Sequence, residues 1–255
     1  REELMKKIVI LIVSSLFSLF LLVSSGSESF AGGNDIELNT ISPISQGDFE
    51  DLSKEVGLLI SYVPLAPAEP LGILGFDIGL EVTGAKISSG PWEKALSDAK
   101  PPDYLILPKI HVQKGLPFGI DVGAVFSTVP GSNITLFGGE VKYAVLKGSI
   151  VSPAVAVRGT YTTLSGVDDI DASTYSLDAS VSKGFGPLTP YAGLGQVWIS
   201  ASENVNDSLI NLDDVSTSAT KLFLGAKLKI LLVSIVLQAD ISDVNMYSAR
   251  ANVSF

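Results

Sequence analysis

Residues 71–255 alternate between apolar and polar or small side chains in one segment after another. Because successive side chains of a strand point to opposite faces, each such segment predicts a strand with one apolar face and one polar face. The segments lie near 71–84, 103–114, 117–128, 134–146, 149–163, 173–184, 187–200, 218–229, 231–242 and 245–255. We therefore expect about ten strands, within a range of eight to twelve.

The connections between these segments differ in length. Residues 114–117 and 147–149 are tight turns containing glycine, whereas 87–102 and 201–216 are long loops. Short periplasmic turns, long loops at the other end and an even strand number are typical of transmembrane barrels. A soluble sandwich or barrel alternates in the same way, but its solvated face would here be unusually rich in Gly and Ser. The predicted fold is all-β: an antiparallel up-and-down transmembrane β-barrel.

One segment before the strands has a helical period. Phe49, Leu52, Val56 and Leu59 recur at steps of three and four, which predicts a helix over 46–60 with an apolar face. The prolines that follow exclude both a continued helix and a central strand. We expect this helix to plug the barrel at its periplasmic mouth. The alternatives are a helix packed beneath the barrel and a strand over 57–63.

The N-terminal residues have the pattern of a secretory signal peptide. Met5 and two lysines precede an apolar run over 8–23, and small residues then lead to Ala31. We expect cleavage after Ala31, with residues 1–4 upstream of the true start. A retained anchor is the alternative, although the run is short for a span of about 20 residues. The predicted division is a signal peptide over 1–31, a polar segment with the helix and a proline-rich link over 32–70, and an outer-membrane barrel over 71–255.

Composition removes several classes of function. The chain has 255 residues, a net charge of −10, no Cys and one His, and its mean hydropathy of +0.41 is high. An acidic chain lacks the basic stripe that binds nucleic acid, and a chain without Cys has neither disulfides nor thiolate metal sites. Acidic loop residues suit either a loosely held Ca²⁺ or plain solvation, and solvation is the reading we adopt; they are Asp168, Asp169, Asp171, Asp213 and Asp214. No metal or cofactor is predicted.

The polar faces of the predicted strands carry charges of both signs, and these should line the barrel interior. They are Asp77, Glu81, Lys109, His111, Asp121, Glu140, Lys142, Arg158, Asp178, Lys227, Asp240 and Arg250. Buried charges need partners, so we expect either an ion-pair network that stiffens the barrel or a polar path for a solute. A ten-strand barrel is only slightly wider than one filled by side chains, so a wide pore is not expected.

The chain ends on an aromatic residue within an alternating strand. Tyr247, Val253 and Phe255 share one face of this last segment. The arrangement resembles the C-terminal signal that the barrel assembly machinery reads in bacterial outer-membrane proteins. Further phrases are similar to a family of uncharacterised Gram-negative outer-membrane barrels; they are LAPAEPLG at 65–72, GFDIG at 75–79, KGLPFGIDVG at 114–123 and PYAGLGQVW at 190–198. The chain also loosely resembles the fatty-acid transport barrels, which have an N-terminal hatch and more strands.

These patterns and resemblances imply a location in the bacterial outer membrane and three functional hypotheses. The leading one is a structural or porin-like barrel for passive passage of a small or hydrophobic solute, with the helix as plug. The alternative is surface binding or adhesion through loops 87–102 and 201–216. The third is a lipid-modifying membrane hydrolase using His111 and Glu81, but no nucleophile stands beside them in the pattern. The expected partners are membrane lipid, the assembly machinery and such a solute.

Overall fold

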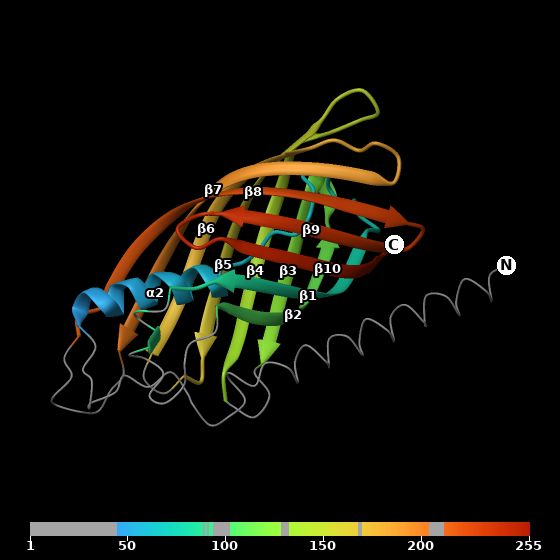
Figure 1. Ribbon diagram of the computed structural model, residues 1–255. Helices are drawn as coiled ribbons and strands as arrows, with labels where there is room; N and C mark the ends of the chain where they lie inside the picture. The colour runs from blue at the N-terminus through green and yellow to red at the C-terminus, as the bar shows by residue number, and fades with distance from the viewer. Residues whose placement is uncertain are drawn as a thin grey trace.

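The computed structural model describes residues 45–88, 90, 92–93, 103–128, 133–167, 170–203 and 212–255. Within these ranges the chain forms a closed antiparallel barrel in which each strand pairs with its sequence neighbours and β1 pairs with β10 (Figure 1). The predicted up-and-down barrel of ten strands is confirmed. The strands are β1 (Phe76–Lys86), β2 (Tyr104–Gly115), β3 (Ile120–Thr128), β4 (Thr135–Lys147), β5 (Ala154–Ser165), β6 (Ile170–Ser182), β7 (Leu188–Glu203), β8 (Val215–Ile230), β9 (Val233–Ile241) and β10 (Met246–Ser254).

Strand boundaries differ from the prediction at two places. β1 begins at Phe76 rather than near residue 71, because Gly72 has a φ of +81° and opens a turn in which the Gly75 amide bonds the Gly72 carbonyl at 2.9 Å. β7 and β8 extend further than predicted, to Glu203 and from Val215. In both, serines rather than apolar residues continue the outward positions, so the hydrophobic pattern ends before the strand does.

The helix α2 (Gln46–Ile60) has the predicted bounds. The Ser45 hydroxyl accepts a hydrogen bond from the Asp48 amide at 3.2 Å, and the Asp48 carboxylate accepts one from the Ser45 amide at 3.3 Å. This capping box satisfies amides that the first turn leaves without helical partners. All the predicted apolar positions of the helix are buried; they are Phe49, Leu52, Val56 and Leu59.

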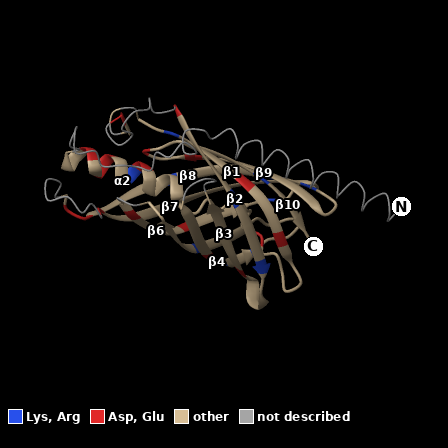
Figure 2. Ribbon diagram, turned by 90° about the horizontal axis from the view of Figure 1, so that it is seen from below, with Lys and Arg blue, Asp and Glu red and all other residues tan. Residues whose placement is uncertain are grey.

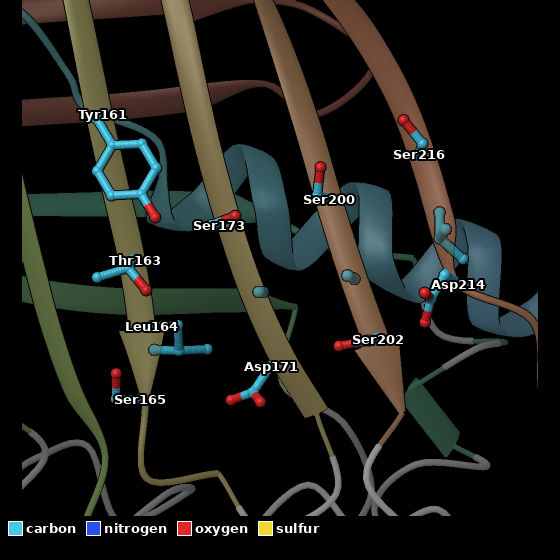
Figure 3. Close-up of a pocket in the computed structure, with 13 residues that line it drawn as sticks. Tyr161, Thr163, Leu164, Ser165, Asp171, Ser173, Ser200, Ser202, Asp214 and Ser216 are labelled. Atoms are coloured by element: carbon cyan, nitrogen blue, oxygen red, sulfur yellow. The ribbon is translucent and has the colours of Figure 1, made fainter.

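The helix lies inside the barrel, at the end where the longer connections 87–103 and 204–214 are found. It contacts β1 and β5–β8, and Figure 3 shows it crossing behind β5–β8. Figure 1 places it at the end away from the C-terminus, and in Figure 2 its acidic positions are red at that same end. The predicted position at the mouth with the short turns is therefore wrong. The inner wall is apolar near the longer connections and charged at the opposite end, where the C-terminus lies. The apolar face of α2 packs on the apolar part of this wall.

From α2 the chain returns through the barrel to the opposite end. Residues 61–68 are all buried, and β1 starts beyond them, where the Phe76 and Phe255 backbones exchange hydrogen bonds of 2.8 and 3.0 Å. We refer to residues 61–71 as the return segment. Its prolines remove amide donors that a sheet would need, which explains why it stays outside the sheet. The short 3₁₀ turn η1 (Pro117–Gly119) joins β2 and β3 at this end.

The outer wall of the barrel is apolar over most of its height. Large hydrophobic side chains exposed there include Ile78, Ile110, Phe126, Phe137, Val141, Leu177, Leu194, Leu222, Leu237 and Ile241. Tyr104, Tyr161, Tyr175 and Tyr247 are exposed near the strand ends beside the longer connections, and the Tyr175 and Trp198 rings stack at 5.0 Å. No helix among the described residues is long and apolar enough to cross a membrane. The predicted signal peptide over 1–31 and the polar residues to 44 lie outside the described part of the chain.

Candidate functional site in the barrel interior

The charges predicted to line the barrel all belong to inward positions of the strands. Almost all of them are fully buried; they are Asp77, Glu81, Lys109, His111, Asp121, Glu140, Lys142, Arg158, Asp178, Asp240 and Arg250. Lys227 is near the short-turn end and keeps 13% of its side chain exposed. The alternation of each strand therefore brings together, inside one barrel, acids and bases that are far apart in the sequence.

Three buried ion pairs hold neighbouring strands together. Lys109 Nζ is 2.9 Å from Glu81 Oε1, and Lys142 Nζ is 2.9 Å from Asp121 Oδ2. Each of these pairs lies directly across two adjacent strands. In the third, Arg158 Nε is 3.2 Å from Glu140 Oε2. Because each charge faces an opposite one, the desolvation that burial imposes is offset.

A further group of charges lies where β1 pairs with β10 and closes the barrel. Arg250 Nη2 is 3.4 Å from Asp77 Oδ1, and Lys227 Nζ is 3.8 Å from Asp77 Oδ2. The Asn252 amide also donates to Asp77. This cluster joins β1, β8 and β10, so it links the first strand to the last by side chains as well as by the ladder.

The return segment is bound to the wall by these same charged residues. Lys142 Nζ donates to the carbonyls of Pro67 and Glu69, both at 3.0 Å, and Lys221 Nζ donates to the Tyr62 carbonyl at 3.2 Å. The return segment lies outside the sheet, so its carbonyls have no partner in a strand ladder, and a buried carbonyl without a donor is costly. The wall lysines supply the donors that the missing ladder would have supplied.

Two further bonds fix the ends of the return segment. The Ala68 amide donates to Ser182 Oγ at 3.1 Å, and the Leu71 amide donates to both Asp121 carboxylate oxygens at 3.1 Å. Asp121 thus serves the Lys142 ammonium and the segment backbone at once. The segment is consequently attached to β3, β4, β6 and β8, which lie around the barrel.

His111 connects the segment to β1. Its Nδ1 is 2.9 Å from Glu81 Oε2, and its Nε2 is 2.7 Å from the Tyr62 hydroxyl. With a neutral imidazole, Nδ1–H donates to the carboxylate and Nε2 accepts from the hydroxyl. All three groups are buried. The imidazole is fully buried, so a substrate does not reach it in this state, and this geometry does not favour the hydrolase hypothesis.

Apolar packing seals the other half of the interior. The apolar face of α2 joins one cluster with inward side chains that include Leu105, Ile170, Val197, Ile199 and Met246. Gly57 of α2 sits so close to Ile199 that an added Cβ would be 2.3 Å from its Cγ2. Below the helix, Leu65 packs with Tyr191, Phe223 and Val236. The interior therefore has an apolar layer around α2 and a charged layer around the return segment.

The open face of α2 is attached to the barrel mouth. Glu55 accepts a hydrogen bond from Trp92 Nε1 at 2.6 Å and another from the Ser88 amide at 3.2 Å. Lys54 forms an ion pair with Asp243. The Gln46 side chain exchanges bonds of 3.2 and 2.9 Å with the Asp213 backbone. Polar contacts to three connections thus supplement the apolar packing of the helix.

Several interior residues were not among the predicted set. Lys221 is fully buried. It lies an even number of residues from Lys227 on β8, so the alternation of the strand already predicted that it points inward. Gln113 follows Lys109 and His111 on the inward face of β2 and donates to Glu140. Tyr62 follows Leu59 by three positions and so continues the apolar stripe of the helix, but it stands beyond the end of α2, and no strand period marked it as facing His111. The uncharged run of Val63 to Ala68 was the available hint that this stretch is buried.

Some predicted sites fall partly or wholly outside the described residues. Of loops 87–102 and 201–216, the structure describes residues 87–88, 90, 92–93, 201–203 and 212–216. Asp168 and Asp169 are also outside, so the alternative Ca²⁺ site is not tested. Within the described ranges, no group of three or more His, Cys, Asp or Glu side chains could hold a metal ion. On the last strand, Tyr247, Val253 and Phe255 face outward, and the Phe255 ring stacks on Phe76 at 5.7 Å.

No protein-family model and no curated protein matches this sequence. Among solved structures, the chain is similar to the N-terminal β-barrel domain of Pseudomonas aeruginosa OprF, with 15% identity, 72% of this chain and 99% of that chain covered, and a TM-score of 0.34. It is also similar to Neisserial surface protein A, with 13% identity over 70% of this chain and 95% of that one and a TM-score of 0.30. A third is the attachment invasion locus protein Ail of Yersinia pestis, solved with the heparin analogue sucrose octasulfate, with 9% identity over 71% and 97% and a TM-score of 0.27. These scores are too low to assign an activity, and nothing here supports the resemblance to fatty-acid transport barrels.

Proposed function

We propose that this chain is an outer-membrane β-barrel that its own N-terminal segment closes. The distribution of side chains supports a membrane location, because the outer wall is apolar with tyrosines near its edge while the interior is charged. A soluble barrel has the opposite arrangement. The signal-like pattern over residues 5–31 supports the same destination.

The observation that carries the proposal is the burial of residues 61–68 inside the barrel. Lys142, Lys221 and His111 bind this stretch from different strands, and α2 fills the mouth above it. A solute cannot pass while both are in place. The resting protein is therefore a closed, structural barrel, and any passage requires the return segment to move.

The chemistry of the interior limits what could pass. A hydrophobic solute would have to cross the charged layer, whereas a small polar solute would meet the apolar layer around α2. One layer is charged and the other is apolar, so no single class of solute finds a favourable path through both in the closed state. Passage of a small solute is consequently a property of a rearranged state in which the segment has left its lysine donors.

Planar-bilayer recording tests this proposal on the full-length protein. The wild type should show no steady conductance. The variant Lys142→Gln removes the ammonium that pairs with Asp121 and donates to the carbonyls of Pro67 and Glu69. We therefore expect brief openings of the barrel in this variant. Lys183→Gln is the matched control, because Lys183 also binds backbone carbonyls but does so in an exposed turn.

The outcomes separate the parts of the proposal. A steady open pore in the wild type would contradict closure by the return segment. Openings of equal frequency in Lys183→Gln and Lys142→Gln would show that the lysine contacts to the segment are not what keeps the barrel shut. Complete silence of Lys142→Gln, with correct folding, would leave a structural barrel and remove gated passage.

A further inference from the structure

The short turns at the end of the barrel away from α2 share a pattern that the closure of the barrel does not use (Figure 1). Each turn begins at a lysine, and a large apolar residue follows within two to four positions. These pairs are Lys114 and Phe118, Lys147 and Ile150, Lys183 and Phe185, and Lys229 and Leu231. Residues 114–119, 147–153, 183–187 and 229–232 contain no Asp or Glu. The turns are therefore basic, in a chain whose net charge is −10.

The apolar residues of these turns project away from the barrel. Between 63% and 97% of each side chain is exposed, and Leu74, in the turn before β1, is exposed in the same way. We refer to Leu74, Phe118, Ile150, Phe185 and Leu231 as the apolar tips. On β8, the exposed Leu228 and Ile230 lead directly to Leu231. The apolar tips thus extend the apolar outer wall to the edge of the barrel.

Two of the apolar tips have backbone conformations that large residues rarely adopt. The φ angle is +66° at Phe118 and +58° at Leu231. This left-handed region is unfavourable for a residue with a Cβ, and turns usually place Gly or Asn there. Because both side chains are exposed, packing within the barrel does not compensate for the strain. Strain of this kind, held at an exposed site, points to a contact outside the barrel.

Contacts between neighbouring turns join them into a ring, which we call the collar; it consists of residues 72–75, 116–119, 148–153, 183–187 and 229–232. Lys114 Nζ donates to the Ile73 carbonyl at 2.6 Å. The Lys147 side chain lies over Gly119, where an added Cβ would be 3.1 Å from the Lys147 Cε. The first two lysines of the pattern thus each reach across to another turn.

The same arrangement continues around the barrel. Lys183 Nζ donates to the Ile150 carbonyl at 2.6 Å, and the Lys229 amide donates to the Pro187 carbonyl at 2.8 Å. The lysine of one turn therefore fixes the backbone of the next. The collar holds its apolar tips in place before any partner binds, which lowers the entropy cost of binding.

Two collar lysines have ammonium groups that are available to an outside anion. Lys147 and Lys229 are exposed, and within the described residues neither ammonium pairs with an acid or donates a hydrogen bond. Glu69 of the return segment is half-buried beside Gly184, so the four lysines leave this end with an excess of positive charge. The charge of the collar thus complements a phosphate-bearing surface.

The height of the collar matches the inner boundary of the membrane. Tyr175 and Trp198 stack on the outer wall near the longer connections, where aromatic residues mark one boundary of the apolar band. Phe185 follows Tyr175 by ten residues. At about 3.3 Å per residue and a strand tilt of about 40°, this distance spans about 25 Å of membrane, which is the usual height of the band.

We propose that the collar is seated in the inner leaflet and binds its anionic phospholipids. The apolar tips contact the acyl chains where these meet the headgroups, and Lys147 and Lys229 bind the phosphates. A leaflet surrounds the barrel on all sides, which fits tips carried by turns all around it. The continuity of the tips with the lipid-facing wall favours lipid over a periplasmic protein. The inference rests on the proposed membrane location and does not depend on the plug.

Quenching by spin-labelled lipids tests the position of the apolar tips. Single cysteines in the full-length protein carry an environment-sensitive dye, and vesicles contain phosphatidylglycerol with a quencher either near the headgroup or near the chain end. Phe118→Cys and Leu231→Cys should be quenched most by the label near the headgroup. Leu194→Cys, in the exposed middle of β7, should be quenched most by the deep label. Glu50→Cys, exposed on α2, should be quenched by neither.

These outcomes separate the collar from the membrane location. If Leu194→Cys is quenched but Phe118→Cys and Leu231→Cys are not, the collar is not seated in lipid, and a periplasmic protein becomes the partner that covers the tips. If Leu194→Cys escapes quenching as well, the membrane location on which the inference rests is wrong.

Native mass spectrometry of the full-length protein tests the lysines. Supplied with equal amounts of phosphatidylglycerol and phosphatidylcholine of the same chains, the wild type should retain phosphatidylglycerol preferentially. Each lysine near an anionic surface favours binding about fivefold. The double variant Lys147→Gln, Lys229→Gln should therefore lose preference on the order of tenfold.

Lys86→Gln is the matched control, because Lys86 is exposed at the opposite end of the barrel. Its preference should equal that of the wild type, and heat-modifiable migration on a gel should show that all variants are folded. An unchanged preference in the double variant would overturn the inference, as would an equal loss in Lys86→Gln.

Discussion

Two aspartates of the barrel interior illustrate how differently buried charges are satisfied. Asp121 accepts hydrogen bonds from the Leu71 amide and pairs with Lys142. Asp178 is equally buried, but neither of its carboxylate oxygens accepts a hydrogen bond from the described residues. Arg158 lies across from it on β5 but pairs with Glu140 instead. The first carboxylate stabilises the fold through its partners, and the second has little of that stabilisation to lose.

We therefore expect Asp121→Asn and Asp178→Asn to differ in stability. The first change leaves Lys142 without its counter-charge and should lower the free energy of unfolding by about 3 kcal/mol. The second removes a poorly satisfied charge and should change it by less than about 1 kcal/mol. Urea unfolding of the protein in detergent or vesicles measures both. A larger loss in Asp178→Asn than in Asp121→Asn would contradict this reading of the two sites.

The sequence predicted which charged residues point inward, and it placed Glu81 beside His111, but it did not predict the other pairs. The face to which a side chain points follows from its position within its own strand. Glu81 and Lys109 could therefore each be placed inside the barrel from their own segments. Their contact depends on the register between β1 and β2, which the turns and the loop set. The bond from Tyr62 to His111 was further out of reach, because it joins a segment without a regular period to a strand.

The helix α2 is the element whose position matters most for closure. Its apolar face, its capping residue and its bounds follow from a local pattern. The end of the barrel that it occupies follows instead from the inward positions of the strands. Leu105, Ile199 and Met246 make the wall apolar near the longer connections, whereas Asp77 and Asp121 make it charged at the other end. The helix thus packs where its apolar face removes apolar surface from water.

Two glycines of α2 provide a matched test of this docking. An added Cβ at Gly57 would overlap Ile199, whereas one at Gly47 would meet nothing within 4 Å. Gly47→Ala should stabilise the folded protein by about 0.5–1 kcal/mol, because alanine favours the helix. Gly57→Ala should destabilise it by about 1–3 kcal/mol through overpacking. The midpoint of urea unfolding reports both, and equal effects of the two changes would show that α2 does not pack against β7.

At the scale of the whole molecule, the barrel interior serves as a core. Around α2 that core is apolar like the core of a soluble domain, and around the return segment it is a network of ion pairs. The chain therefore runs along the barrel once on the inside, as the return segment, before β1 begins the wall. This path places the start of α2 beside residue 213, in the connection between β7 and β8.

The orientation of this path predicts which residues reagents can reach in intact cells. The natural chain has no Cys, so single substitutions report cleanly. Glu50→Cys, on the exposed side of α2, should react with a membrane-impermeant maleimide, because long barrel loops face outward. Ile150→Cys, in the turn between β4 and β5, should react only after the outer membrane is permeabilised. Ser53→Cys, on the buried face of α2, should stay unlabelled while α2 is docked. The reverse labelling of Glu50→Cys and Ile150→Cys would show that the barrel has the opposite orientation in the membrane. Rapid labelling of Ser53→Cys would show that α2 leaves its site in the resting protein.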